Sequence, residues 1–98
     1  MDEARLISIE RPTASGVVSE KPCLVHSICG IGIAQTSNVY TVYDGQSTAG
    51  KVIMRLVAGS YSADFRLFAA PFYFSKGIYV DFTTNGEEVV IQFMQLAR

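Results

Sequence analysis

The side chains with the most chemical potential in this 98-residue chain are one histidine and two cysteines. Cys23, His26 and Cys29 lie within one largely apolar stretch. Residues three apart on a strand project from opposite faces, so we expect neither cysteine to pair with His26. Two cysteines and one histidine, without a closely spaced cysteine pair, also fall short of a tetrahedral zinc set. We therefore expect His26 to be a satisfied core or interface side chain, and we expect no metal site.

The same two cysteines could form a disulfide only if the chain folded back sharply between them. Cys23 and Cys29 are six positions apart, which corresponds to about 20 Å along an extended strand. The Cα atoms of a disulfide lie within about 7 Å of each other. We therefore expect two buried free thiols.

Acidic residues could act as general acids or bases if two of them faced each other across a cleft. Asp44 lies in an Asp-Gly dipeptide, where its side chain is expected to organise a turn. Asp81 is expected on the outer face of a strand, and Glu87 and Glu88 are expected to be solvated at a hairpin tip. The sequence pattern shows no partner placed beside these carboxylates for acid–base catalysis.

The glycine-containing segments do not complete an enzyme motif. Residues 58–62, AGSYS, lack the second glycine of a nucleophile elbow. Residues 30–32, GIG, lack the third glycine and the strand-to-helix context of a dinucleotide-binding loop. We therefore expect no catalytic residue, no cofactor and no enzymatic activity.

The composition is apolar for so short a chain. Hydrophobic residues make up 49% of the sequence and charged residues 17%, against an average of about 25% charged, and the mean hydropathy is +0.25. A single domain of this size has a modest core, so part of the apolar material is expected on the surface. We expect an obligate oligomer or a permanently docked subunit; the alternative is an unusually apolar monomer.

Charge gives no sign of a nucleic-acid or membrane partner. The net charge is −1, and the eight basic residues are scattered along the chain, so the concentrated positive surface that either partner requires is missing. No apolar stretch approaches the roughly 20 residues needed to cross a bilayer, and the first residues do not follow a signal-peptide pattern. We expect the chain to be made in a cytoplasm and to stay there, or to leave as part of a larger assembly.

Short runs of β-branched and aromatic residues, separated by turn residues, predict an all-β fold. The turn dipeptides Asp44-Gly45 and Asn85-Gly86 are typical of loops between strands, and Asn85-Gly86 predicts a hairpin that joins the last two strands. No segment has a helical period. The sequence predicts an antiparallel β-sandwich, jelly-roll-like, of seven to eight strands. Its extended segments are expected at residues 5–10, 23–29, 39–43, 51–57, 61–68, 72–74, 78–82 and 88–96, and the domain proper is expected to begin at Val17 and Val18.

Alternation along the last strands indicates which faces are covered. Ile78, Val80 and Phe82 share one face, as in a strand with one wet side. The final strand instead has two apolar rows: one is Val89, Ile91 and Phe93, and the other is Val90, Met94 and Leu96, interrupted by Gln92. We expect a neighbouring subunit to cover the second row, which makes Val90, Met94 and Leu96 candidate partner-binding residues. The alternative is a central strand covered within the same chain.

Eleven aromatic residues and no tryptophan are spread through the strands. Exposed rings could form a platform for stacking sugars, so a carbohydrate-binding module for host attachment is a competing interpretation. Residues 72–74, FYF, are more simply explained by packing at a sheet edge.

Several segments together resemble a known class of proteins. They are residues 21–28 (KPCLVHSI), 40–45 (YTVYDG), 47–53 (STAGKVI) and 74–82 (FSKGIYVDF). The chain resembles the small β-sandwich virion proteins of tailed bacteriophages, in which a strand ending in YDG leads through a Ser/Thr/Gly loop to the next strand. The similarity covers about residues 17–95, and its motifs encode mainly turns and inward rows.

The resemblance implies a structural protein of the virion without enzymatic activity. It favours a capsid decoration (cement) subunit, often a homotrimer, that binds the major capsid protein or another virion protein; a head–tail junction, tail or fibre position is the alternative. Residues 1–15 lie outside the similarity and are expected to form an N-terminal arm ahead of a sandwich domain at residues 16–98. In that arm, Leu6, Ile7 and Ile9 are candidate partner-binding residues that add a strand to a neighbour or dock on the shell. A disordered or self-packed N-terminus is the alternative.

Overall fold

The computed structural model describes residues 7–32, 38–59, 62–82 and 88–96. All regular structure in this part of the chain is β-strand, and none of it is a helix that could span a membrane. The strands are β1 (Ser8–Glu10), β2 (Gly16–Ser19), β3 (Cys23–Ile31), β4 (Asn38–Asp44), β5 (Lys51–Ala58), β6 (Ala63–Phe74), β7 (Ile78–Phe82) and β8 (Glu88–Gln95).

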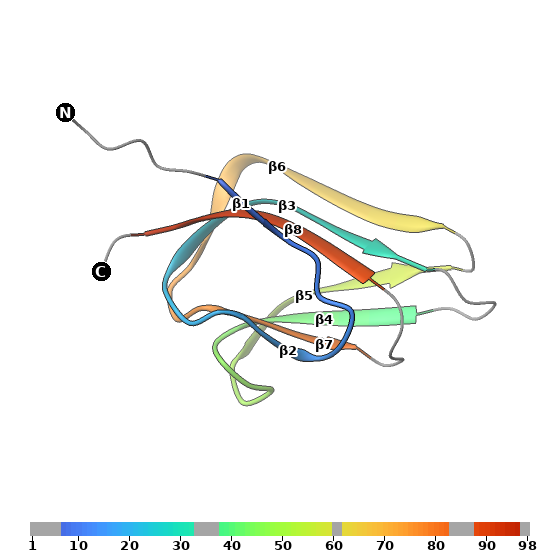
Figure 1. The fold of residues 1–98 in the computed structure, drawn as a ribbon, viewed down its shortest axis with the longest axis horizontal. Helices are drawn as coiled ribbons and strands as arrows, with labels where there is room; N and C mark the ends of the chain where they lie inside the picture. Colours follow the sequence, from blue (N-terminus) through green and yellow to red (C-terminus); the bar gives the residue numbers. More distant parts are fainter. Residues whose placement is uncertain (1–6, 33–37, 60–61, 83–87, 97–98) are drawn as a thin grey trace.

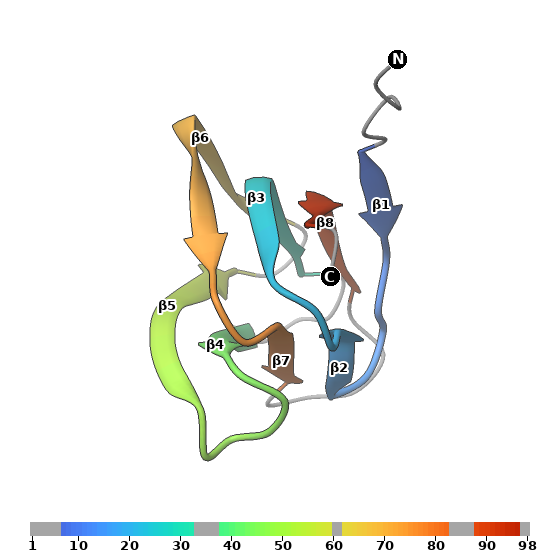
Figure 2. The ribbon, with the colours of Figure 1, turned by 90° about the vertical axis from the view of Figure 1, so that its left-hand side faces the viewer.

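The strands form two four-stranded antiparallel sheets that pack face to face (Figure 1). Sheet A has the order β1-β8-β3-β6 and sheet B the order β2-β7-β4-β5. Figure 2 shows sheet A above sheet B, with β6 over β5 at one side and β1 over β2 at the other. Successive strands alternate between the sheets, except that β4 and β5 are neighbours in sheet B. An eight-stranded sandwich of this order is a jelly roll, which confirms the expected fold.

The core lies between the sheets and is filled by the inward rows of the strands. Tyr40 spans the interior: its ring packs edge-on to Phe82 with 5.1 Å between centroids, and its hydroxyl donates to the Ile31 carbonyl at 2.6 Å. Gly30 leaves room for that ring, because a Cβ at position 30 would collide with it. The expected inward row of β7 is confirmed. The buried apolar residues are Cys23, Val25, Ile28, Tyr40, Val42, Leu56, Ala58, Phe74, Ile78, Val80, Phe82, Val89, Ile91 and Phe93.

The expected hairpin between the last two strands is wrong. β7 pairs with β2 and β4 in sheet B, whereas β8 pairs with β1 and β3 in sheet A. The chain therefore crosses between the sheets after β7, and the Asn85-Gly86 dipeptide lies in that connection, outside the described residues. The apolar rows of β8 complete sheet A, so tertiary packing outweighs the local hairpin preference of Asn-Gly.

Residues 61–68 and 72–74 were expected as separate strands, but β6 is one strand of twelve residues. Proline is tolerated within it because β6 is the outer strand of sheet A and lacks a ladder partner on one side. Pro71 also lies where the register slips: Val25 faces Phe72, and Ser27 already faces Leu67. The strand therefore bends at Pro71 without leaving the sheet.

A β-bulge at His26 changes which face of β3 the side chains occupy. Val25 faces Phe93 of β8 and Ser27 faces Gln92, so β3 has one extra residue at this point. Before the bulge Cys23 is inward, and after it Ile28 is inward, which turns Cys29 outward. The expectation that both cysteines project from the same face was therefore wrong, and strict alternation fails because of the extra residue.

The N-terminal segment packs on its own chain from Ser8 onward. β1 pairs antiparallel with β8, and the following residues cross to sheet B. This crossing is held by an Arg11–Glu88 ion pair at 2.8 Å and by the Val89 N–H, which donates to the Pro12 carbonyl. Ser15 Oγ accepts from the Phe82 N–H at 2.8 Å. In this structure the described part of the predicted arm is thus an integral edge of the sandwich, and Glu88, expected to be only solvated, holds a partner.

Candidate interaction surface

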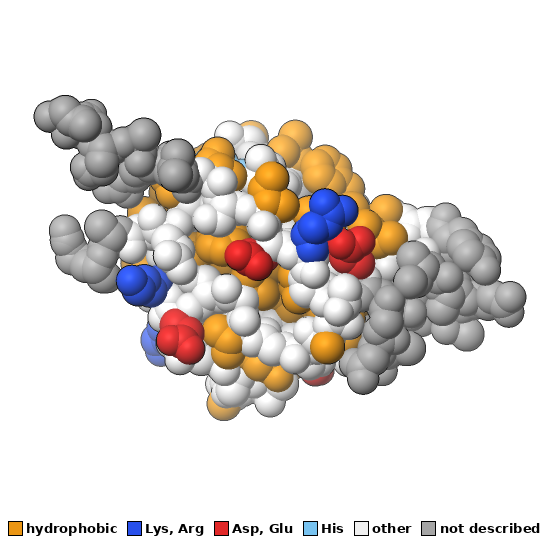
Figure 3. All heavy atoms as spheres, in the orientation of Figure 1, with side chains coloured by type: hydrophobic (Ala, Val, Ile, Leu, Met, Phe, Trp, Pro, Cys, Tyr) orange, Lys and Arg blue, Asp and Glu red, His pale blue; other side chains and the backbone are white. Residues whose placement is uncertain are grey.

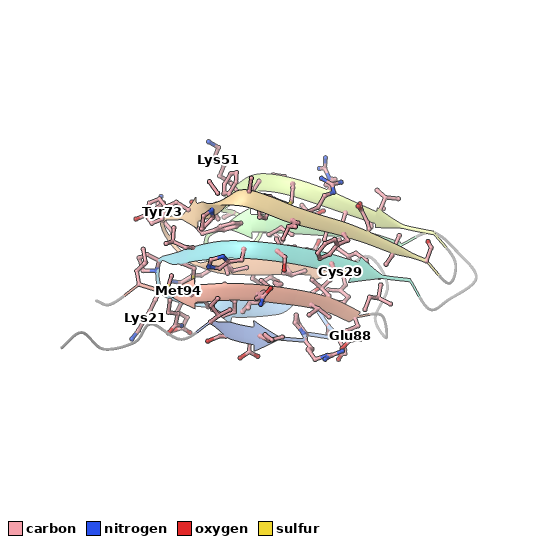
Figure 4. The ribbon with its side chains drawn as sticks, turned by 90° about the horizontal axis from the view of Figure 1, so that it is seen from above. Lys21, Cys29, Lys51, Tyr73, Glu88 and Met94 are labelled. Carbon is pink, nitrogen blue, oxygen red and sulfur yellow. The ribbon has the colours of Figure 1, made fainter. Side chains whose placement is uncertain are left out.

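The outer face of sheet A is built from side chains that alternate with the core rows. The pairing register aligns them across the sheet, from one end to the other, in successive rows: Met94, Leu24 and Tyr73; then Ile9, Gln92, Ser27 and Leu67; then Val90, Cys29 and Phe65; and finally Glu88, Ile31 and Ala63. Figure 4 looks onto this face, with Tyr73 and Met94 toward one end and Cys29 and Glu88 toward the other.

Large apolar side chains dominate this surface. Leu67 is 71% exposed, Phe65 59%, Ile9 57% and Tyr73 53%. Figure 3 shows hydrophobic side chains gathered along the upper margin of the molecule, over the strands of sheet A. No described strand forms a further layer over them, because the sandwich has two sheets only. We call this surface the apolar face; it comprises Ile9, Leu24, Cys29, Ile31, Phe65, Leu67, Tyr73, Val90 and Met94.

A small polar island interrupts the apolar face at the bulge. The Ser27 hydroxyl donates to the Gln92 side-chain oxygen at 3.2 Å, and Ser27 is nearly buried by its neighbours. His26 Nε2 is buried and has no hydrogen-bond partner among the described residues, so it is not a satisfied core histidine; a role at an interface stays a prediction. The ion pair of Arg11 and Glu88 stands at one end of the face.

The outer face of sheet B is different in character. Its rows contain Asp81 opposite Thr41, with Arg55 on the next strand, and Tyr43 packs edge-on to Tyr79 with 6.0 Å between ring centroids. This is the mixed surface of a sheet that faces water. Val17, Val52 and Val57 are also exposed on this face, but they are smaller than the exposed side chains of sheet A, and Asp81 and Arg55 lie among them, so the apolar outer face of sheet A is the larger one.

Three of the six partner-binding residues predicted from the sequence meet on this surface. Val90 and Met94 belong to the apolar face on β8, and Ile9 lies beside them on β1. Ile7, two positions before Ile9, is 47% exposed. Leu96 follows β8, is half-buried, and its N–H donates to the Pro22 carbonyl at 2.9 Å. Leu6 lies outside the described residues. Whether these side chains bind a partner stays a prediction.

Sequence reasoning missed the part of the apolar face that β6 contributes. Phe65, Leu67 and Tyr73 are its most exposed members apart from Ile9. The signal was present in the sequence, because the row of Ala63, Phe65, Leu67, Ala69, Pro71 and Tyr73 is apolar throughout, and the other row is apolar after Arg66. Splitting this segment at Pro71 obscured that pattern.

The adjoining edges of the two sheets are joined by side chains. Asp64 of β6 accepts from the Val57 N–H of β5 at 3.0 Å and from Arg66 at 3.0 and 3.1 Å. The guanidinium of Arg66 and the Val57 N–H lower the pKa of Asp64, because both favour the charged carboxylate. Arg66 also donates to the Arg55 carbonyl at 3.4 Å. Two backbone groups on the outer edge of β5 are thus occupied within the chain, which weakens this edge as a template for another strand.

A depression with a volume of about 910 Å³ lies at the end of the sandwich near the β4–β5 loop. Asp44 in its wall accepts from Ser75 N–H, Ser75 Oγ and Lys76 N–H at 2.8 to 3.1 Å. Its carboxylate therefore organises the loop after β6, whereas the sequence predicted that it would organise its own turn. Lys51 and Lys76 also line the wall.

The two cysteines lack the features of reactive thiols. Both are free; Cys23 is buried and Cys29 half-buried. Burial raises the pKa of each thiol, which reduces the reactive thiolate at neutral pH. Among the described residues, no three His, Cys, Asp or Glu side chains come together as a metal-ligating group.

Comparison with protein families, with curated proteins and with solved structures finds no match to this chain. The functional argument therefore depends on the surfaces described above.

Proposed function

We propose that this chain is a structural subunit of a virion, a capsid decoration (cement) protein that binds and stabilises a phage head through symmetric protein–protein contacts. It acts without catalysis and as an oligomer of itself, and it reaches the virion from the host cytoplasm. The observation that carries the proposal is the apolar face of sheet A, whose exposed side chains are larger than those on the outer face of sheet B.

The size of the apolar face supports an assembled rather than a solitary molecule. Its most exposed side chains come from β1 and β6, on both sides of the half-buried rows of β3 and β8, so the patch extends over all four strands around the polar pair of Ser27 and Gln92. Apolar patches of more than a few hundred Å² on soluble proteins usually mark interfaces. Covering such a surface gains about 25 cal/mol per Å² before the costs of association.

The choice of a virion follows from the resemblance of residues 17–95 to small phage virion proteins, and the jelly roll is compatible with it. Jelly rolls occur in viral capsid proteins, but also in lectins and cupins, so the fold alone does not select a function. A repeated shell supplies many identical binding sites, and contacts repeated by symmetry replace the need for one tight site.

The experiment that tests the proposal adds purified protein to undecorated phage heads and measures the bound copies by gel densitometry. Hundreds of copies per head, together with greater resistance of the head to heat, would support a decoration protein. About a dozen copies would place the protein at the head–tail junction instead. No binding to any particle would contradict a virion role.

The exposed ring of Tyr73 keeps carbohydrate binding as a second candidate. Tyr73 is 53% exposed at one end of the apolar face, and its ring could stack on a sugar. A glycan array with the wild-type protein and Tyr73→Ala distinguishes the two functions: glycan binding that the variant loses would favour host attachment over a shell role.

A further inference from the structure

We infer that the apolar face is covered by a second copy of this chain, with the two A sheets packed face to face about a two-fold axis. This inference depends on the proposed function, because it names the partner that covers the same surface.

The exposed apolar area on this side of the molecule supports a second copy as the partner. The five most exposed side chains on this side are Ile7, Ile9, Phe65, Leu67 and Tyr73. Together they leave on the order of 600 Å² uncovered, before the half-buried members are counted, and a stable interface takes about 800 Å² from each partner. One face of one sheet therefore supplies the area that a stable dimer needs from each copy.

The lack of charged residues in most of the apolar face also supports a second copy. The three rows that run from Met94 to Phe65 contain no Lys, Arg, Asp or Glu, and the ion pair of Arg11 and Glu88 stands at the end of the face. A two-fold interface brings the same patch together from both copies, so it must be compatible with itself. An uncharged apolar patch meets that condition, whereas a partner of strong charge would find no ion to pair with.

The way β-sheets pack supports association through the apolar face. Two β-sheets with apolar faces pack about 10 Å apart with their strands nearly aligned. Growth by strand addition at the β5 edge is opposed, because Asp64 and Arg66 occupy backbone groups of Val57 and Arg55. Association through the face is therefore favoured over association through that edge. A two-fold contact makes dimers, and the trimer implied by the resemblance would need contacts elsewhere.

The test places a charge on the apolar face and a matched charge on sheet B. Leu67→Lys puts an ammonium group at the most exposed position of the face, and Val57→Lys does the same on the outer face of sheet B, where Val57 is 55% exposed. Sedimentation equilibrium over a concentration series gives the mass, and circular dichroism verifies that each variant is folded. Both sites are more than half exposed, so both variants should fold.

Wild type and Val57→Lys should have twice the chain mass of 10.7 kDa, whereas Leu67→Lys should dissociate with a dissociation constant at least about tenfold higher. A monomeric or trimeric wild type, or a dimer that Leu67→Lys leaves intact, would overturn the inference. Equal weakening by Val57→Lys would overturn it as well, because the effect would then not be specific to the apolar face.

A second readout uses Cys29, which lies on the apolar face between Val90 and Phe65. Its alkylation should be faster in Leu67→Lys than in wild type, because the second copy no longer covers it; Cys23 is fully buried and serves as the internal control. Equal rates in both proteins would contradict the inference. Head binding is measured separately: a monomer that still decorates heads would overturn only the pairing, and a dimer that binds no particle would overturn only the proposed function.

Discussion

The carboxylate of Asp64 on β6 accepts a hydrogen bond from the backbone N–H of Val57 on β5, so a side chain of sheet A caps the free edge of sheet B. Arg66, two residues further along β6, adds a bond to the Arg55 carbonyl. Natural β-proteins protect their edge strands against pairing with other chains, and charged side chains are a common means. Here the charges come from the opposite sheet.

Removing this cap should expose the β5 edge. We expect Asp64→Ala to lower the free energy of unfolding by about 0.5–1 kcal/mol, since the lost bonds are largely exposed to solvent. We also expect faster aggregation, measured by light scattering during storage. Asp81→Ala is the control, because the Asp81 carboxylate accepts a bond from the Ser15 hydroxyl on the face of sheet B. Equal aggregation of both variants would contradict the role of the edge.

The same carboxylate predicts a pH dependence. The pKa of Asp64 is lowered in the folded chain, first by Arg66 and then by the Val57 N–H. A carboxyl of this kind contributes stability above its unfolded pKa and loses that contribution as the pH falls through its folded pKa. The stability gap between wild type and Asp64→Asn, measured by urea unfolding, should therefore narrow as the pH falls from about 5 to about 2. A constant gap would refute this assignment.

Ser19 is a buried hub at the turn between β2 and β3. Its hydroxyl accepts from the Lys21 N–H, from Cys23 Sγ and from Gln95 Nε2 at 3.1 to 3.2 Å. Ser19→Ala leaves buried donors without an acceptor, so we expect a loss of about 1–3 kcal/mol in unfolding free energy. Ser47→Ala should cost far less, because the Ser47 hydroxyl accepts from Ala49 N–H in an exposed loop. Chemical denaturation of both variants measures the difference.

Gly77 connects β6 to β7 with a φ of 122°, in the region that side chains rarely adopt. A Cβ there would also collide with the Ser19 carbonyl. We expect Gly77→Ala to lower the melting temperature clearly, with a cost above about 1 kcal/mol. Gly16→Ala is the matched control, since a Cβ at Gly16 meets nothing within 4 Å. A similar shift in both variants would show that the strain is not at residue 77.

The sequence predicted the strand content well, because alternation and turn residues are local signals. The apolar second row of β8, Val90 and Met94, also pointed to a surface that the chain itself leaves uncovered. The matching row on β6 was missed, since Pro71 suggested a break, and only the position of β6 at the sheet edge explains why proline is tolerated. Edge and central strands cannot be distinguished from one segment alone.

Long-range arrangement was less predictable. The Asn85-Gly86 dipeptide favours a hairpin locally, yet β8 lies between β1 and β3 because its inward row fits sheet A. The bulge at His26 left no local sign either, and it alone decides that Cys23 faces the core while Cys29 faces outward. One extra residue in one strand reverses every later side chain, and nothing in residues 23–29 marks its place.

The position of β8 between β1 and β3 limits which strand pairings can form while the chain is being synthesised. Among the described strands, β4 and β5 are the one consecutive pair that is hydrogen-bonded, so a growing chain can form a single local hairpin during synthesis. The β1–β8 and β3–β8 pairings of sheet A must wait until the last strand has been synthesised. Long loop closures of this kind slow folding, and the apolar strands of the nascent chain stay exposed during that delay. Chaperone dependence during expression is the practical consequence.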